Sequence, residues 1–108
     1  MKVQQPILPV LILPMYRIID KRGNGKTSRL MLLAKENNGI VVCANPDAMR
    51  VKAQSYGFDD IEFISYWTYM EDTKGWNATR KPIFIDELEN FTMAACGKIT
   101  GYSLTNED

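Results

Sequence analysis

Residues 39–66 constrain the fold most, because their pattern predicts a strand, a helix and a second strand in close succession. GIVVCAN (39–45) is a continuous apolar, largely β-branched run, as expected of a strand that is covered on both faces. Helix signals follow: Asn45 suits the N-cap, Pro46 the first helical position, and Gly57 the stop. IEFISY (61–66) is a second strand candidate. Two such strands joined through a helix predict a parallel sheet with helices on its faces.

The same alternation extends to both sides of this segment. Before it, YRIID (16–20) is a short strand candidate, and the helix former TSRLMLLAKENNG is closed by Gly39. After it, KPIFIDE (81–87) and KITGYSL (98–104) are strand candidates on either side of a short helix over 88–97. A chain of 108 residues can bury one core and is too short to divide into several domains. The sequence therefore predicts an α/β fold, a minimal three-layer domain with a mainly parallel sheet of about five strands.

The amino-terminal residues 1–14 form a separate unit, which contains the apolar, proline-spaced run PILPVLILP. This run is too short to span a bilayer, and we expect no membrane association. A signal peptide remains an alternative, although prolines interrupt the apolar run and no small-residue cleavage site follows. The composition favours an extended arm that packs on the domain or on a neighbouring chain, and the compact domain then covers residues 15–108.

The net charge limits the kinds of binding partner that the sequence indicates, and the cysteines indicate the redox state of its compartment. Thirteen basic and thirteen acidic residues cancel, so the net charge does not indicate nucleic-acid binding, and only a local basic patch leaves that open. Cys43 and Cys96 stand far apart in apolar segments, and the chain has no histidine to complete a metal site. We expect two buried free thiols in a reducing, cytoplasmic compartment. The aromatics Tyr66, Trp67, Tyr69 and Trp76 are typical of packing or of a protein interface rather than of base stacking.

Two short motifs stand at the ends of predicted strands. GNGKT (23–27) opens a helix, and its glycines lack the β-carbons that would keep backbone amides away from an anion. PIFIDE (82–87) is a buried strand that ends in the acid pair Asp86–Glu87. Because the carboxyl ends of parallel strands share one edge, where open α/β sheets hold their ligands, the two motifs are expected to meet there.

Together the motifs resemble the Walker A and Walker B elements of the P-loop nucleoside-triphosphatase superfamily, in particular the branch with a glutamate directly after the Walker B aspartate. The resemblance covers most of residues 15–105 as an order of elements. It implies that ATP or GTP binds with Mg²⁺, with Thr27 and Asp86 as metal ligands and with Lys26 and Glu87 as catalytic residues. The residues implied to bind the phosphates are Gly23, Asn24, Gly25, Lys26, Thr27 and Ser28.

The chain departs from the P-loop pattern at Asp20, where the family has its first glycine. A carboxylate at this point is expected to repel phosphate unless it points away. This departure bears on hydrolysis more than on the fold, so we expect hydrolysis that is weak or that depends on assembly.

Two branches of the superfamily are similar in different segments. FIDELENF resembles thymidine kinases, whose zinc lobe and lasso this chain lacks. KITGYSLTNED resembles the strand that senses the γ-phosphate in phage packaging motors and helicases, which makes Thr100 and Ser103 sensor candidates. Their cores are about twice as long, so a motor function requires a homo-oligomer or a partner protein. A non-catalytic interaction module with the same fold and a nucleoside kinase remain the alternatives.

Overall fold

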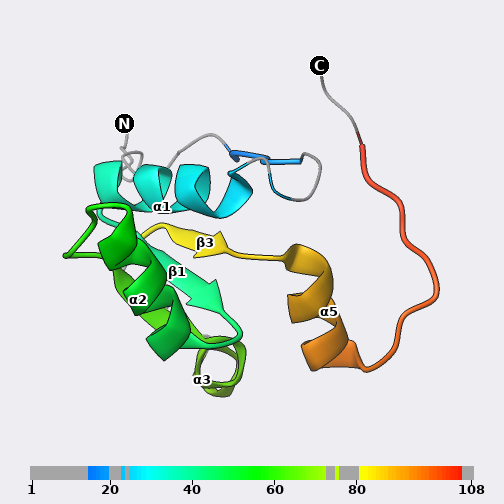
Figure 1. Ribbon diagram of the computed structural model, residues 1–108. Helices are drawn as coiled ribbons and strands as arrows, with labels where there is room; N and C mark the ends of the chain where they lie inside the picture. The colour runs from blue at the N-terminus through cyan, green and yellow to red at the C-terminus, as the bar shows by residue number, and fades with distance from the viewer. Residues whose placement is uncertain (1–14, 20–22, 24, 73–74, 76–80, 106–108) are drawn as a thin grey trace, which may run out of the picture.

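The computed structural model describes residues 15–19, 23, 25–72, 75 and 81–105. Its elements alternate along the chain, as Figure 1 shows. In order they are α1 (Lys26–Glu36), β1 (Ile40–Cys43), α2 (Pro46–Ser55), β2 (Glu62–Ser65), α3 (Tyr66–Glu71), β3 (Ile83–Ile85) and α5 (Leu88–Cys96).

The sheet is parallel, and β1 is its central strand. The strand order is β2-β1-β3, and both neighbours run parallel to β1. Val41 lies opposite Phe63 on one side and opposite Phe84 on the other. The carboxyl ends of all three strands therefore lie at one edge of the sheet.

Helices cover both faces of this sheet, because successive side chains of a strand point to opposite faces. One face packs against α1 and α2, and its buried residues are Met31, Ala34, Val41, Cys43, Met49, Ala53, Phe63 and Phe84. The other face packs against α3 and α5, and its buried residues are Ile40, Val42, Ile64 and Tyr66. All four residues of β1 are buried, as the continuous apolar run predicted. The α/β prediction is confirmed.

The boundaries of α2 follow the predicted signals, and the end of α1 does not. Asn45 is the N-cap of α2, and its side chain accepts a hydrogen bond from the Ala48 amide at 3.2 Å. Pro46 is the first residue of that helix, and Gly57 follows its end with a φ of 87°. The helix α1 ends at Glu36 with Asn37 as its C-cap, so the prediction of Gly39 as the C-cap was wrong. The Gly39 amide donates to the Ala34 carbonyl at 2.8 Å.

The expected number of strands was wrong. The sheet of the described residues has three strands, not about five, because residues 16–19 and 98–104 form no strand. A strand in such a sheet needs apolar cover on both faces, and these segments lack it: Ile19 is 76% exposed and Leu104 is 63% exposed. Residue 20 and the arm over residues 1–14 lie outside the described residues, as does Trp76.

The two cysteines are both free, as predicted, but only one is buried. Cys43 lies in the core at the end of β1. Cys96 is exposed, which corrects the expectation of two buried thiols. It is the last residue of α5, a helix without any fully buried residue. Among the ranges described above, no helix has both the length and the apolar character needed to cross a membrane.

Gly39 is predicted to be required for the packing between α1 and β3. A β-carbon on Gly39 would lie 2.5 Å from the Phe84 ring and 2.8 Å from the Pro82 carbonyl oxygen. We expect Gly39→Ala to lower the free energy of unfolding by about 1–3 kcal/mol, since the ring or the backbone must move. Gly101→Ala is the matched control, because its β-carbon would meet nothing within 4 Å. Urea denaturation of both variants measures the difference, and equal stability would contradict this packing.

Candidate functional site

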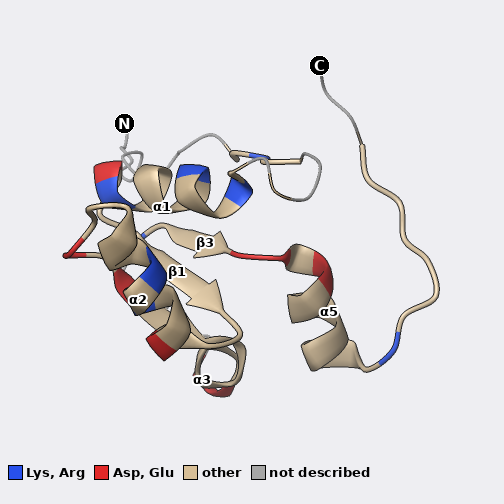
Figure 2. Ribbon diagram, in the orientation of Figure 1, with Lys and Arg blue, Asp and Glu red and all other residues tan. Residues whose placement is uncertain are grey.

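The first turn of α1 meets the end of β3 at the carboxyl edge of the sheet. The Thr27 hydroxyl lies 3.4 Å from Asp86 Oδ1, and it donates a long hydrogen bond across 59 residues of sequence. Figure 2 shows the acidic turn between β3 and α5 at the same end of the sheet as the basic residues that begin α1. The structure thus brings together the two residues predicted to bind metal.

The loop before α1 has the backbone that its glycines permit. Gly23 has a φ of 83° and Gly25 a φ of 75°, both in the left-handed region that glycine adopts without strain. Gly25 is the N-cap of α1 and provides no side chain to cap the helix. Its carbonyl accepts hydrogen bonds from the Ser28 hydroxyl at 3.0 Å and from the Arg29 amide at 3.1 Å. The first turn of α1 therefore begins with backbone amides that no N-cap side chain covers.

Of the predicted phosphate-binding residues, Asn24 lies outside the described residues. Lys26 is the first residue of α1 and is half-buried. Its positive charge lowers the pKa of Asp86, by less than the Thr27 hydrogen bond does. Lys26 and Thr27 are the first two residues of α1, and Thr27 contacts Asp86 directly after β3.

Asp86 is half-buried, and its surroundings disfavour the charged form of its carboxylate. Its amide donates to the Val42 carbonyl at 2.9 Å, which extends the β-ladder one residue beyond β3 and fixes the backbone. Burial raises the pKa of Asp86 first, and the neighbouring charge of Glu87 raises it further. Thr27, Lys52 and Lys26 lower this pKa by smaller amounts. A cation at the carboxylate would relieve this cost.

Glu87 has a left-handed backbone, with a φ of 58° and a ψ of 73°. This conformation costs a residue with a β-carbon about 1–3 kcal/mol. It turns the chain from β3 into α5, and the Glu87 carbonyl accepts the Phe91 amide at 3.1 Å as the first bond of that helix. The Glu87 side chain is exposed at the same edge of the sheet.

Two further residues lie at this edge, and sequence reasoning assigned neither of them to the site. The Cys43 thiol donates to the Ile64 carbonyl, with its sulfur 3.7 Å from the oxygen, and burial raises its pKa to about 11, so it stays neutral. The Tyr66 hydroxyl donates to the Asp86 carbonyl at 2.7 Å. A signal for both was available, because each stands at the carboxyl end of a predicted strand.

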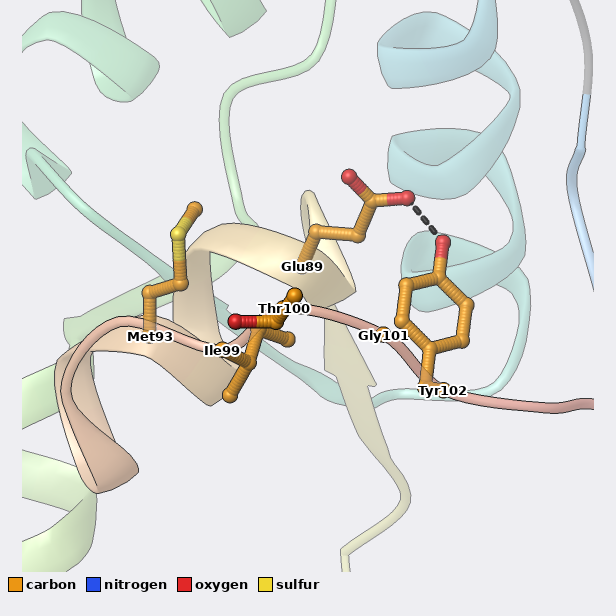
Figure 3. A pocket seen from close by; sticks show the side chains of 6 residues that line it. All are labelled: Glu89, Met93, Ile99, Thr100, Gly101 and Tyr102. Carbon is orange, nitrogen blue, oxygen red and sulfur yellow. Dashed lines mark hydrogen bonds between the residues drawn. The ribbon is translucent and has the colours of Figure 1, made fainter.

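The sensor candidates Thr100 and Ser103 do not lie on a strand of the sheet. Thr100 lines a hollow of about 200 Å³ between α5 and the segment after it, together with Glu89, Met93, Ile99, Gly101 and Tyr102 (Figure 3). The Tyr102 hydroxyl donates to the Glu89 carboxylate across this hollow. Ser103 is exposed on the same irregular segment. Because residues 98–104 form no strand, the sheet does not carry them to its carboxyl edge.

The donor set fits Mg²⁺ that is shared with a phosphate. Within the described ranges, no three His, Cys, Asp or Glu side chains form a cluster able to hold a metal by themselves. Mg²⁺ is usually held by one or two protein oxygens plus substrate phosphates, each about 2.0–2.1 Å away in octahedral geometry, so adjacent ligands lie about 3 Å apart. The separation of 3.4 Å between the Thr27 and Asp86 oxygens is close to this requirement.

Comparisons with protein-family models, with curated proteins and with solved structures find no match to this chain.

The raised pKa of Asp86 predicts that its charge destabilises the ligand-free chain. In the pH range above the ordinary value of 3.8, the folded chain holds this proton more tightly than the unfolded chain. Folding stability therefore falls as the pH rises through that range. Asp86→Asn, which keeps an oxygen for Thr27, should raise the free energy of unfolding more at pH 7 than at pH 3.

Asp60 provides the control of opposite sign, because its hydrogen bond to Lys35 lowers its pKa. We expect Asp60→Asn to give no gain at pH 7. Thermal denaturation between pH 3 and pH 7 compares the two variants. A loss of stability in Asp86→Asn at pH 7 would contradict the electrostatics described for the site.

Proposed function

We propose that this chain binds Mg²⁺ with a nucleoside triphosphate, ATP or GTP, and hydrolyses it slowly or upon assembly. The observation that supports this function is the contact between Thr27 and Asp86, since it joins a hydroxyl from a helix start to a carboxylate from a strand end. Each group alone is common in proteins. Their meeting at the carboxyl edge of a parallel sheet is the arrangement that binds a metal together with a phosphate.

The phosphates would lie at the start of α1. Left-handed Gly23 and Gly25 let backbone amides face an anion, and the positive end of the helix dipole adds to the attraction. Lys26 provides an ammonium at the same point. The bound phosphates would also bring Mg²⁺ to the Asp86 carboxylate. The charge of Mg²⁺ would then stabilise the ionised form of Asp86, which burial and Glu87 disfavour.

Hydrolysis would depend on Glu87, which stands next to the metal ligand and is exposed. An exposed carboxylate with a fixed backbone can orient or deprotonate an attacking water. The described sheet has three strands, and Thr100 and Ser103 do not lie on it. Contacts to the γ-phosphate would then come from a second copy or a partner chain, which would make turnover depend on assembly.

The placement of Thr100 and Ser103 also favours a second candidate, a non-catalytic module that binds the nucleotide without turnover. In this case the nucleotide would act as a ligand that stabilises the fold and its interaction surface. Phosphate release, measured with the purified chain alone and at high concentration, separates the two candidates. Release above that of Lys26→Ala supports the enzyme, and equal release supports the module.

Lys26→Ala is predicted to weaken nucleotide binding about tenfold to a hundredfold, the range for a lost hydrogen bond to a charged group. Lys35→Ala is the matched control, because Lys35 lies in the last turn of the same helix and pairs with Asp60. Titration calorimetry with Mg²⁺ and ATP or GTP measures both. Unchanged affinity in Lys26→Ala would show that the glycine loop does not hold phosphate.

Glu87→Gln is predicted to separate binding from turnover. The amide keeps the size of the side chain and loses the base, so affinity for the Mg²⁺-nucleotide should stay within about twofold while hydrolysis is abolished. Phosphate release and calorimetry on the same sample test this. Full hydrolysis by Glu87→Gln would remove Glu87 from the catalytic role.

A further inference from the structure

Tyr66 reaches the acid pair from the other side of the sheet. It is the first residue of α3 and follows directly after β2, whereas Asp86 follows β3. Its hydroxyl oxygen lies 2.7 Å from the Asp86 carbonyl and 3.4 Å from the Glu87 carbonyl. The hydroxyl therefore donates its one proton to the Asp86 carbonyl, and the Glu87 carbonyl is a longer, secondary acceptor. These are the two residues proposed to act on the metal and on the water.

The Tyr66 ring is held in place by its packing. It is 2% exposed, and it meets the Phe91 ring edge-on with centroids 5.4 Å apart. The Trp67 ring is also near it, tilted by 41° with centroids 5.9 Å apart. With the ring held by this packing, the hydroxyl is directed toward the turn after β3, where it donates to the Asp86 carbonyl. Burial raises the pKa of Tyr66 to about 12, so the hydroxyl remains a donor at neutral pH.

The turn after β3 needs such a donor. The Asp86 amide is bonded to β1, but the chain then leaves the ladder at Glu87 with a left-handed φ of 58°. A strained residue keeps its conformation only when its surroundings fix it. The described surroundings that do so are the first bond of α5 and the Tyr66 hydroxyl.

We propose that Tyr66 is a positioning residue, which aims the Asp86 carboxylate at the metal by fixing the backbone on which it stands. This inference rests on the proposed function, since it concerns the same site. In this role Tyr66 would contact neither the nucleotide nor the metal. It acts through the Asp86 carbonyl, so its removal should affect the contribution of Mg²⁺ to binding and spare the contribution of the phosphate loop.

Tyr66→Phe tests this, because it keeps the ring and removes the hydroxyl. The readout is the ratio of two ATP dissociation constants, one measured in EDTA and the other with Mg²⁺. We expect this ratio to fall about three- to tenfold in Tyr66→Phe, the effect of one lost hydrogen bond, while the affinity in EDTA stays within about twofold. A merely structural role would leave the ratio unchanged or lower both affinities together.

Two controls separate positioning from stability. Tyr56→Phe removes a hydroxyl from an exposed ring, 45% exposed, that packs on Phe58. Phe58→Leu loosens the core on the opposite face of the sheet and leaves the ring contacts and the hydroxyl of Tyr66 in place. Both variants should retain the wild-type ratio, and a ratio in Phe58→Leu as low as in Tyr66→Phe would overturn the inference.

The outcomes also distinguish this inference from the function on which it rests. A wild-type ratio well above one that is unchanged in Tyr66→Phe would overturn the role of Tyr66 and leave the function intact. A wild-type chain without affinity for ATP or GTP, with or without Mg²⁺, would overturn both.

Discussion

The pairing of β1 with parallel neighbours on both sides is the constraint on which the rest of the structure depends. Parallel pairing puts the ends of β1, β2 and β3 at one edge, and there the chain places Cys43, Ser65 and Asp86. It requires a central strand buried on both faces, which Ile40–Cys43 provides. Helices packed on the two faces then bring Thr27 to Asp86 on one side and Tyr66 to the Asp86 backbone on the other.

The site is costly to the fold in the absence of a ligand, and that cost supports a binding role. Asp86 is a half-buried carboxylate next to a second acid, and Glu87 has a strained backbone. Neither feature adds to stability, and perturbed pKa values and backbone strain gather at functional sites. Nearby Lys26 and Thr27 compensate Asp86 in part, and Mg²⁺ with a phosphate would complete this compensation.

The sequence predicted the part of the fold that local chemistry dictates. The continuous apolar run IVVC predicted a strand buried on both faces. Asn45 and Pro46 predicted the start of α2, and both predictions are confirmed. The meeting of the two motifs followed from parallel topology. The strand predicted over residues 98–104 was wrong because strand formation depends on apolar neighbours, and Tyr102 and Leu104 are exposed. The hydrogen bond from Tyr66 was not predictable, since it joins residues 20 apart whose approach is set by packing between α3 and α5.

The most direct test of a metal–nucleotide site between Thr27 and Asp86 is paramagnetic broadening of backbone amide signals by Mn²⁺, added in place of Mg²⁺ in the presence of ATP. We expect trace Mn²⁺ to broaden the amides of Thr27, Cys43 and Asp86 first, because these lie at the carboxyl edge of the sheet. The exposed acids Asp59 and Asp60 should keep sharp signals. Broadening centred on Asp59 and Asp60, with Thr27 and Asp86 unaffected, would contradict this location of the site.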